Sequence, residues 1–188
     1  PVISILLDDE MDLGQEFFRW EIAVATAGSI LSINAFDQPN VQESKTNTNQ
    51  ILEMIRQGQE PRYETPTLID GSIKVYSRGS IDDLGEALEE FLAQGNPGDF
   101  ISLMAYITEN KETQQALQEL RLNFRELTHL ATTVGFGPRF LHSTGQYHKG
   151  GTDNGLFLQL TADHQHDLNI PGQPYTFSKF LEAQALGD

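Results

Sequence analysis

Short apolar segments alternate along this chain with longer amphipathic segments, and this alternation constrains the fold more than any other feature. The apolar segments have the length of strands and cover residues 2–7, 72–77, 100–107, 131–134 and 155–161. Helical patterns cover residues 12–31, 111–127 and 138–149 and the segments that start at Pro39 and Ser80. Because strands that alternate with helices are joined by crossovers, we predict an α/β fold, a three-layer αβα sandwich with a mostly parallel sheet.

Local signals refine two of the predicted helices. The first helix carries an apolar stripe made of Phe17, Trp20, Val24, Ala27 and Leu31. For the helix near residue 80 we expect Ser80 to be the cap, with Asp83 three residues later in the position of a capping box.

The length of 188 residues is enough for one domain with a continuous core. We find no internal repeat and no convincing boundary, so we expect residues 1–188 to form a single domain. The chain starts at Pro1 without a Met and enters an apolar segment at once, and we therefore expect it to be the C-terminal domain of a longer protein.

Composition excludes several classes of function. Twelve Lys and Arg residues against 27 Asp and Glu residues give a net charge of −15, which repels nucleic acid and anionic membranes. There are no cysteines and no apolar segment long enough to cross a bilayer, and we expect no signal peptide, because a basic start followed by an apolar h-region is not seen. We expect a cytoplasmic protein with no nucleic acid partner and no membrane contact.

The first candidate site lies in "NAFDQPNVQESK", residues 34–45. Gln38 precedes a predicted helix whose free N–H groups suit an anionic ligand oxygen, and the side chain of Lys45 could reach back over that end. The alternative is that Asp37 or Gln38 only caps the helix and that Lys45 is a solvated surface cation.

The second candidate site lies in "GFGPRFLHSTGQYHKGG", residues 135–151, where a predicted strand leads into a predicted helix. His142 and Gln146 are four residues apart and share a helical face, and a histidine can transfer protons near pH 7. The alternative is a histidine that only bonds a nearby backbone group. A zinc site is disfavoured because the spacing of His142, His148, His164 and His166 matches no zinc motif, so we expect no metal and no cofactor.

Together these stretches resemble glucose-6-phosphate isomerase, and most closely the C-terminal part of the bacterial transaldolase/glucose-6-phosphate isomerase fusion proteins. Residues 16–45 resemble the family segment that ends in N-P-F-D-Q-P-x-V-x-x-x-K, with Ala35 in the place of the family's Pro. Residues 135–151 are similar to F-G-P-R-F-L-H-S-T-G-Q-x-H-K-G-G of the fusion branch. "IPGQPYTF" and "QALGD", near the end of the chain, are also similar to that branch.

The resemblance implies a sugar-isomerase (SIS) type of fold and the interconversion of glucose 6-phosphate and fructose 6-phosphate through a cis-enediol. It implies that Lys45 stabilises negative charge in the open-chain sugar and that His142 assists ring opening. Gln38 and Gln146 match glutamines of the motifs, and we expect both to contact the substrate. The partners implied are the sugar phosphate and the upstream isomerase and transaldolase domains, with a homodimer also possible.

The chain departs from the family in two ways. In the shorter isomerases the histidine motif precedes the F-D-Q-P motif, whereas here it follows. The base glutamate and the phosphate loop of the family match nothing in these residues, so we expect them upstream and expect the isolated chain to be inactive. Two other functions are kept as alternatives: a non-catalytic sugar-phosphate sensor, and a dimerisation domain that uses the long helix from Asp12.

Overall fold

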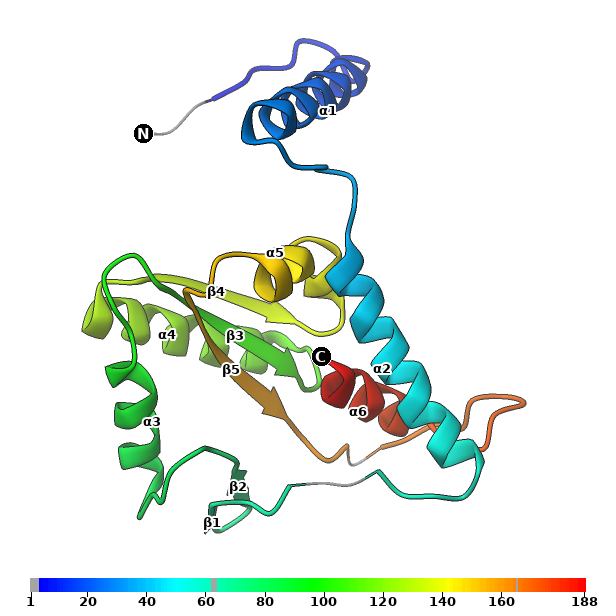
Figure 1. Cartoon of the computed structure of the whole chain (residues 1–188), viewed down its shortest axis with the longest axis vertical. Coiled ribbons are helices and arrows are strands. Elements are labelled where there is room, and N and C mark those ends of the chain that lie inside the picture. Colours follow the sequence, from blue (N-terminus) through cyan, green and yellow to red (C-terminus); the bar gives the residue numbers. More distant parts are fainter. Residues whose placement is uncertain (1–3, 62–63, 165) are drawn as a thin grey trace. The chain divides into compact units, whose positions relative to one another are not determined.

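The computed structural model describes residues 4–61, 64–164 and 166–188 (Figure 1). The chain contacts divide it into two compact units, residues 1–38 and residues 39–188. None of the helices in the described ranges is both long enough and apolar enough to span a lipid bilayer.

The first unit contains one helix, α1 (Asp12–Leu31). The helix ends at Ser32, which adopts a left-handed conformation with φ 57°. The chain then folds back over Gly28, where an added Cβ would lie 3.2 Å from the Cβ of Ala35. Within this unit the predicted apolar stripe is exposed, with Phe17 61% and Trp20 59% exposed.

The predicted strand at residues 2–7 is wrong where it can be examined. Residues 4–7 form no strand, while residues 2 and 3 lie outside the described residues. A strand needs a neighbouring backbone to accept and donate its hydrogen bonds, and residues 4–38, the described part of unit 1, contain no strand. An apolar composition does not by itself provide a neighbouring strand.

The second unit is built on a three-stranded parallel sheet in the order β4-β3-β5. Its strands are β3 (Phe100–Tyr106), β4 (Ala131–Phe136) and β5 (Gly155–Thr161). In the register, Ile101 lies opposite Thr132 on one side and Leu156 on the other. The predicted α/β class and the mostly parallel sheet are therefore confirmed.

Helices cover both faces of this sheet, which is compatible with a three-layer sandwich. Alternate residues of a strand point to opposite faces. On one face Ile101 and Leu103 are fully buried and pack against Phe124 and other side chains of α3 (Leu84–Ala93) and α4 (Lys111–Thr128). Burying each of these large apolar side chains contributes roughly 1.5–3 kcal/mol to folding.

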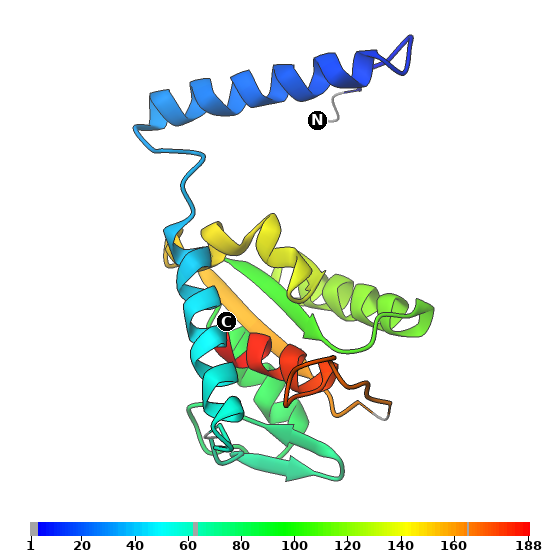
Figure 2. The ribbon, with the colours of Figure 1, turned by 90° about the vertical axis from the view of Figure 1, so that its right-hand side faces the viewer.

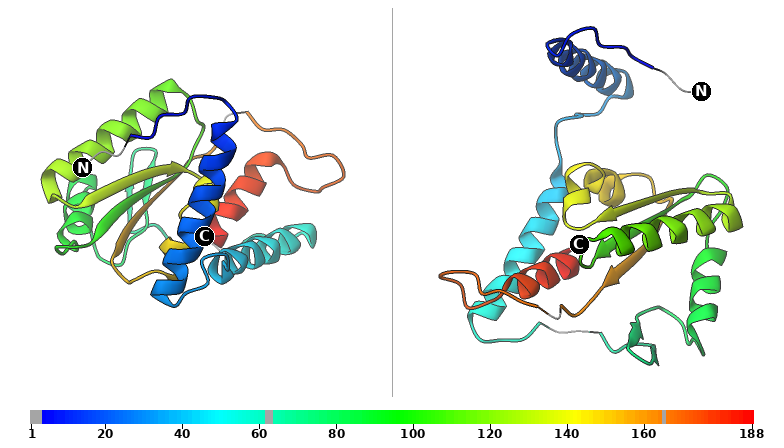
Figure 3. Two further views of the ribbon diagram at one scale, coloured as in Figure 1. Left: turned by 90° about the horizontal axis from the view of Figure 1, so that it is seen from above. Right: turned by 180° about the vertical axis from the view of Figure 1, so that it is seen from behind.

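On the other face Tyr106 packs against Phe140 and Ala185. These two residues belong to the 3-10 helix η1 (Arg139–His142) and to α6 (Phe177–Gly187). The helix α2 (Pro39–Arg56) lies beside α6, where its Leu52 packs against Ala183 (Figures 1 and 3). In Figure 2 the strands lie between α4 and α2.

Several predicted elements differ from the structure. The strand predicted at residues 72–77 is present as β2 (Ile73–Val75), but it pairs with β1 (Leu68–Asp70) in a separate antiparallel hairpin and does not join the parallel sheet. Gly71 takes a positive φ of 59° in the tight turn, which allows the hairpin to form. The backbone of β2 then pairs with β1, its neighbour in the sequence.

The third helix starts later than predicted, because Asp83 and not Ser80 is its cap. The Asp83 side chain accepts a hydrogen bond of 2.9 Å from the Glu86 N–H. The single helix predicted at residues 138–149 is two short ones, η1 and α5 (Gly145–Gly150). The helix α6 was not predicted.

Candidate functional site

The two sequence motifs meet where α5 packs against the first half of α2. The backbone N–H of Asn40 donates to Oε1 of Gln146 at 3.1 Å, and Nε2 of Gln146 donates to Oδ1 of Asn40 at 2.7 Å. These two residues are 106 positions apart in the sequence. The reciprocal pair satisfies an N–H in the first turn of α2 that has no partner within the helix.

Glycines allow the two helices to approach this closely. A Cβ on Gly150 would lie 2.3 Å from Oδ1 of Asn40 and 2.7 Å from Nε2 of Gln146. A Cβ on Gly145 would lie 3.3 Å from the Val41 side chain. The glycines of the H-S-T-G-Q-x-H-K-G-G motif therefore have a packing role at this contact.

The predicted site residues are placed in different surroundings. Gln146 is half-buried and paired with Asn40, as described above. Lys45 on α2 and His142 at the end of η1 are both exposed, and neither forms a hydrogen bond or ion pair with any residue in the described part of the chain. Gln38 belongs to the first unit and directly precedes α2.

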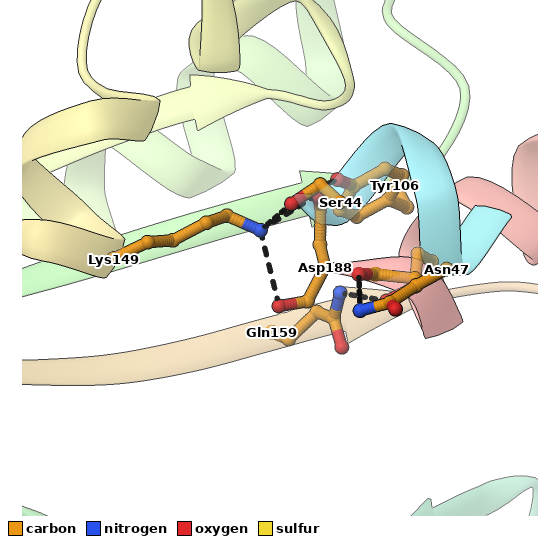
Figure 4. A network of polar contacts seen from close by, with 8 residues as sticks. Ser44, Asn47, Tyr106, Lys149, Gln159 and Asp188 are labelled. Atoms are coloured by element: carbon orange, nitrogen blue, oxygen red, sulfur yellow. Dashed lines mark hydrogen bonds and ion pairs between the residues drawn. The ribbon is translucent and has the colours of Figure 1, made fainter. Parts of the chain in front are cut away.

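A second lysine, Lys149, is less exposed than Lys45. Figure 4 shows the polar contacts around Lys149. Its ammonium donates to the Ser44 hydroxyl, to Oδ1 of Asp188 at 2.9 Å and to the Asp188 carbonyl at 3.3 Å. The Tyr106 hydroxyl donates to the other carboxylate oxygen of Asp188. The side chains of Lys149 and Asp188 are only 19% and 3% exposed, so α2, α5, α6 and β3 meet at a shielded ion pair.

This shielding affects the ionisation of both partners. Burial raises the pKa of the Asp188 carboxyl to about 6, while the hydrogen bond with Ser44 acts in the opposite direction. The adjacent Lys149 ammonium also favours the ionised carboxylate. Burial lowers the pKa of Lys149 from its ordinary value, and the nearby Glu43 carboxylate opposes that shift.

A cavity of about 270 Å³ lies beside this ion pair. Its lining consists of Asn40, Glu43, Ser44, Asn47, Lys149, Gly187 and Asp188. Lys45 and His142 are not part of it. Lys45 is two residues from both Glu43 and Asn47, which is about 200° around the helix axis, so its side chain leaves α2 on another side.

His148 lies in an aromatic cluster next to Lys149. Its ring centroid is 6.0 Å from that of Phe100, 5.8 Å from that of Phe140 and 5.2 Å from that of Phe157. Its Nδ1 atom is buried and has no hydrogen-bond partner in the described residues. Burial lowers the pKa of His148, and the Lys149 charge lowers it further.

Sequence reasoning missed Lys149, Ser44 and Asp188. Lys149 and Ser44 both lie inside the two quoted motifs, and a lysine between a histidine and two glycines was the available signal. Asp188 lies in the quoted "QALGD", but no local pattern connected it with Lys149, which is 39 residues away.

No metal site is formed within the described ranges 4–61, 64–164 and 166–188, where no three His, Asp or Glu side chains gather in a position to hold an ion. His164 instead lies 3.4 Å from the Thr108 hydroxyl.

No protein family model matches the chain, and no solved structure matches it. Function is therefore inferred from the geometry above and from the sequence motifs.

Proposed function

We propose that this chain is the C-terminal, sugar-isomerase-type domain of a glucose-6-phosphate isomerase fused to transaldolase, and that it carries part of the active site. One observation supports this above the others. The two segments on which the resemblance depends pack against each other through the Asn40 and Gln146 amides, although 106 positions separate these residues. Residues from both segments can then contribute to one substrate site.

The chemistry assigned to Lys45 and His142 requires side chains that are available to a ligand. Ring opening of a hexose phosphate moves one proton onto the ring oxygen O5 and removes one from O1, and an imidazole such as His142 can perform both transfers. The enediol that follows carries developing negative charge, which an ammonium such as Lys45 stabilises. Both side chains are exposed and unpaired within the described residues, so no internal bond must be broken first.

The base that moves the proton between C1 and C2, and the loop that holds the phosphate, are assigned to upstream residues of the longer protein. The chain alone would therefore bind substrate weakly and would not turn it over. Adding fructose 6-phosphate to the isolated chain tests this with two readouts, isomerase activity and the NMR signals of the His142 ring. We expect no turnover and a shift of the His142 signals. Turnover near that of an intact enzyme would mean that the base lies within these residues, with Glu16 and Glu21 the first to examine.

The Lys45→Ala substitution in the full-length fusion protein separates an isomerase from a sensor. An isomerase loses kcat on the order of a hundredfold or more, because the lost charge acts mainly on the transition state, while KM changes much less. The matched control is Lys74→Ala, which removes an exposed lysine from β2 and leaves kcat unchanged. Unchanged kcat in the Lys45→Ala protein would contradict the catalytic role and favour the sensor.

A dimerisation role is the second candidate, and one observation favours it. Within its own unit α1 leaves Phe17, Trp20 and Leu31 exposed, and such apolar stripes are common at interfaces between proteins. Light scattering of the chain and of its Trp20→Glu variant distinguishes the cases. A dimer that the substitution dissociates supports this role, and a monomer in both contradicts it.

A further inference from the structure

We propose that the cavity beside the Lys149–Asp188 pair binds a small, neutral, polyhydroxylated molecule, independently of the isomerase function proposed above. The cavity lies between α2, α5 and the end of α6. Lys45 and His142, the residues assigned to the isomerase site, do not line it. Nothing in the mechanism above uses it.

The hydrogen-bonding capacity left in the cavity wall indicates the chemistry of its ligand. The three donors of the Lys149 ammonium are already directed at Ser44 and Asp188. The side-chain N–H₂ of Asn40 has no acceptor in the described part of the chain. The Asn47 side-chain oxygen and the Glu43 carboxylate have no donor there. A ligand must therefore both accept and donate hydrogen bonds.

Charge and bonding together disfavour ionic ligands. The Asp188 side-chain carboxylate offsets the Lys149 ammonium, and Glu43 leaves the side chains of the lining with one excess negative charge. A phosphate dianion would be repelled by the excess negative charge, and its single O–H could donate to only one of the two free acceptors, Asn47 and Glu43. An organic ammonium has no acceptor for the Asn40 N–H₂ group and would lie near the fixed Lys149 charge. Hydroxyl groups both donate and accept, so a polyol satisfies all three free groups.

Size and rigidity are consistent with this ligand class. About 270 Å³ is room for one hexose-sized polyol. The wall is held in place on two sides, by the Asn40–Gln146 amide pair and by the Lys149–Asp188 ion pair. A preformed wall reduces the ordering cost of binding, although with only a few hydrogen bonds we expect an affinity in the millimolar range.

The test is an NMR titration of the whole 188-residue chain with D-sorbitol, and separately with inorganic phosphate and ethylammonium. We expect sorbitol to shift the side-chain amide signals of Asn40 and Asn47 in a saturable way, and expect the two ions to leave them unchanged. No saturable shift with sorbitol, or a larger response to either ion, would overturn the proposal.

Two substitutions test, in the same titration, whether sorbitol binds in this cavity. Asn47→Leu keeps the shape but removes the free acceptor, and we expect it to weaken sorbitol binding about tenfold. Its matched control is Asn49→Leu, which changes an exposed asparagine of the same helix outside the cavity and leaves the affinity unchanged.

Glu43→Gln keeps an acceptor but removes the charge, so sorbitol affinity should stay within about twofold. Saturable ethylammonium binding by the native chain that Glu43→Gln abolishes would mean that the cavity recognises a cation, and would overturn the proposal. Glu43→Gln still tests the proposed ligand class if Asn47→Leu disturbs the fold. The His142 ring signals with fructose 6-phosphate report on the isomerase proposal alone, so that failure of one proposal is distinguishable from failure of the other.

Discussion

At the scale of single residues, His148 combines an apolar environment with an unused polar atom. Three phenylalanine rings surround the imidazole, and its buried Nδ1 has no partner in the described residues. Protonation would place a charge among these rings and beside Lys149. The neutral form is therefore the one that the fold accommodates.

His148 should make the free energy of unfolding depend on pH. Its folded-state pKa is lowered below the ordinary histidine value of about 6.5, so below that pH the unfolded chain binds more protons. Stability from this group is present above about pH 6.5 and is lost as the pH falls through the folded pKa. Urea unfolding between pH 5 and pH 8 measures this effect. We expect the free energy of unfolding of His148→Phe to exceed that of the native chain by an amount that grows as the pH falls.

The comparison with the native chain is needed because Asp188 contributes with the opposite sign. Its pKa is raised to about 6, so its contribution is largest in acid and is lost as the pH rises through about 6. The Asp188 contribution is the same in the native chain and in His148→Phe, so it cancels in the difference between their free energies of unfolding. His166→Gln, at an exposed histidine outside the aromatic cluster, is the control for the removal of an imidazole. A difference between His148→Phe and the native chain that does not change with pH would contradict this role of His148.

At the scale of secondary-structure elements, the start of α3 tests which residue is the cap. Asp83 accepts a hydrogen bond from Glu86, so Asp83→Ala should lower the free energy of unfolding by about 0.5–2 kcal/mol. Ser80→Ala is the matched control and should change it by less than about 0.5 kcal/mol. Denaturant unfolding measures both. Equal losses of stability in the two variants would contradict this and would mean that Ser80 caps the helix, as the sequence pattern predicted.

The contact between α5 and α2 depends on Gly150. A methyl group there would lie 2.3 Å from Oδ1 of Asn40, so Gly150→Ala must displace the Asn40 and Gln146 side chains. We expect a loss of about 1–3 kcal/mol in stability, even though alanine favours helix.

The control for Gly150→Ala is Gly14→Ala in α1, where an added Cβ meets nothing within 4 Å and stability should not fall. Unfolding curves and the amide signals of Gln146 measure the effect. An unchanged Gln146 environment in Gly150→Ala would contradict the close packing.

At the scale of the whole molecule, the three buried apolar clusters formed by the described residues lie within residues 39–188. Residues 39–188 alone should therefore unfold cooperatively and keep the amide signals of β3, whose Ile101 and Leu103 are fully buried. A comparison of NMR spectra with and without residues 1–38 checks this. Loss of cooperative unfolding would show that residues 1–38 are required for the core.

The sequence was most informative where local pattern and tertiary role agree. The apolar segment at residues 100–107 became β3, because a strand buried on both faces needs an apolar residue at nearly every position. The pattern at residues 111–127 became α4 for a similar reason, with Leu117 and Phe124 buried on one side. It failed at residues 4–7, which form no strand, and it did not show that the strand at residues 73–75 belongs to a separate hairpin.

The sequence by itself determined the order of most helices and strands in residues 39–188, the parallel sheet and the two motifs that bear the candidate site, because these depend on periodicity and local residue types. Only the tertiary structure decided that Gln146 pairs with Asn40, that Lys149 is held by Asp188, and that a polar cavity lies between them and α2. These contacts join residues 39 to 106 positions apart. Their formation depends on how the helices pack on the sheet, which no local propensity specifies.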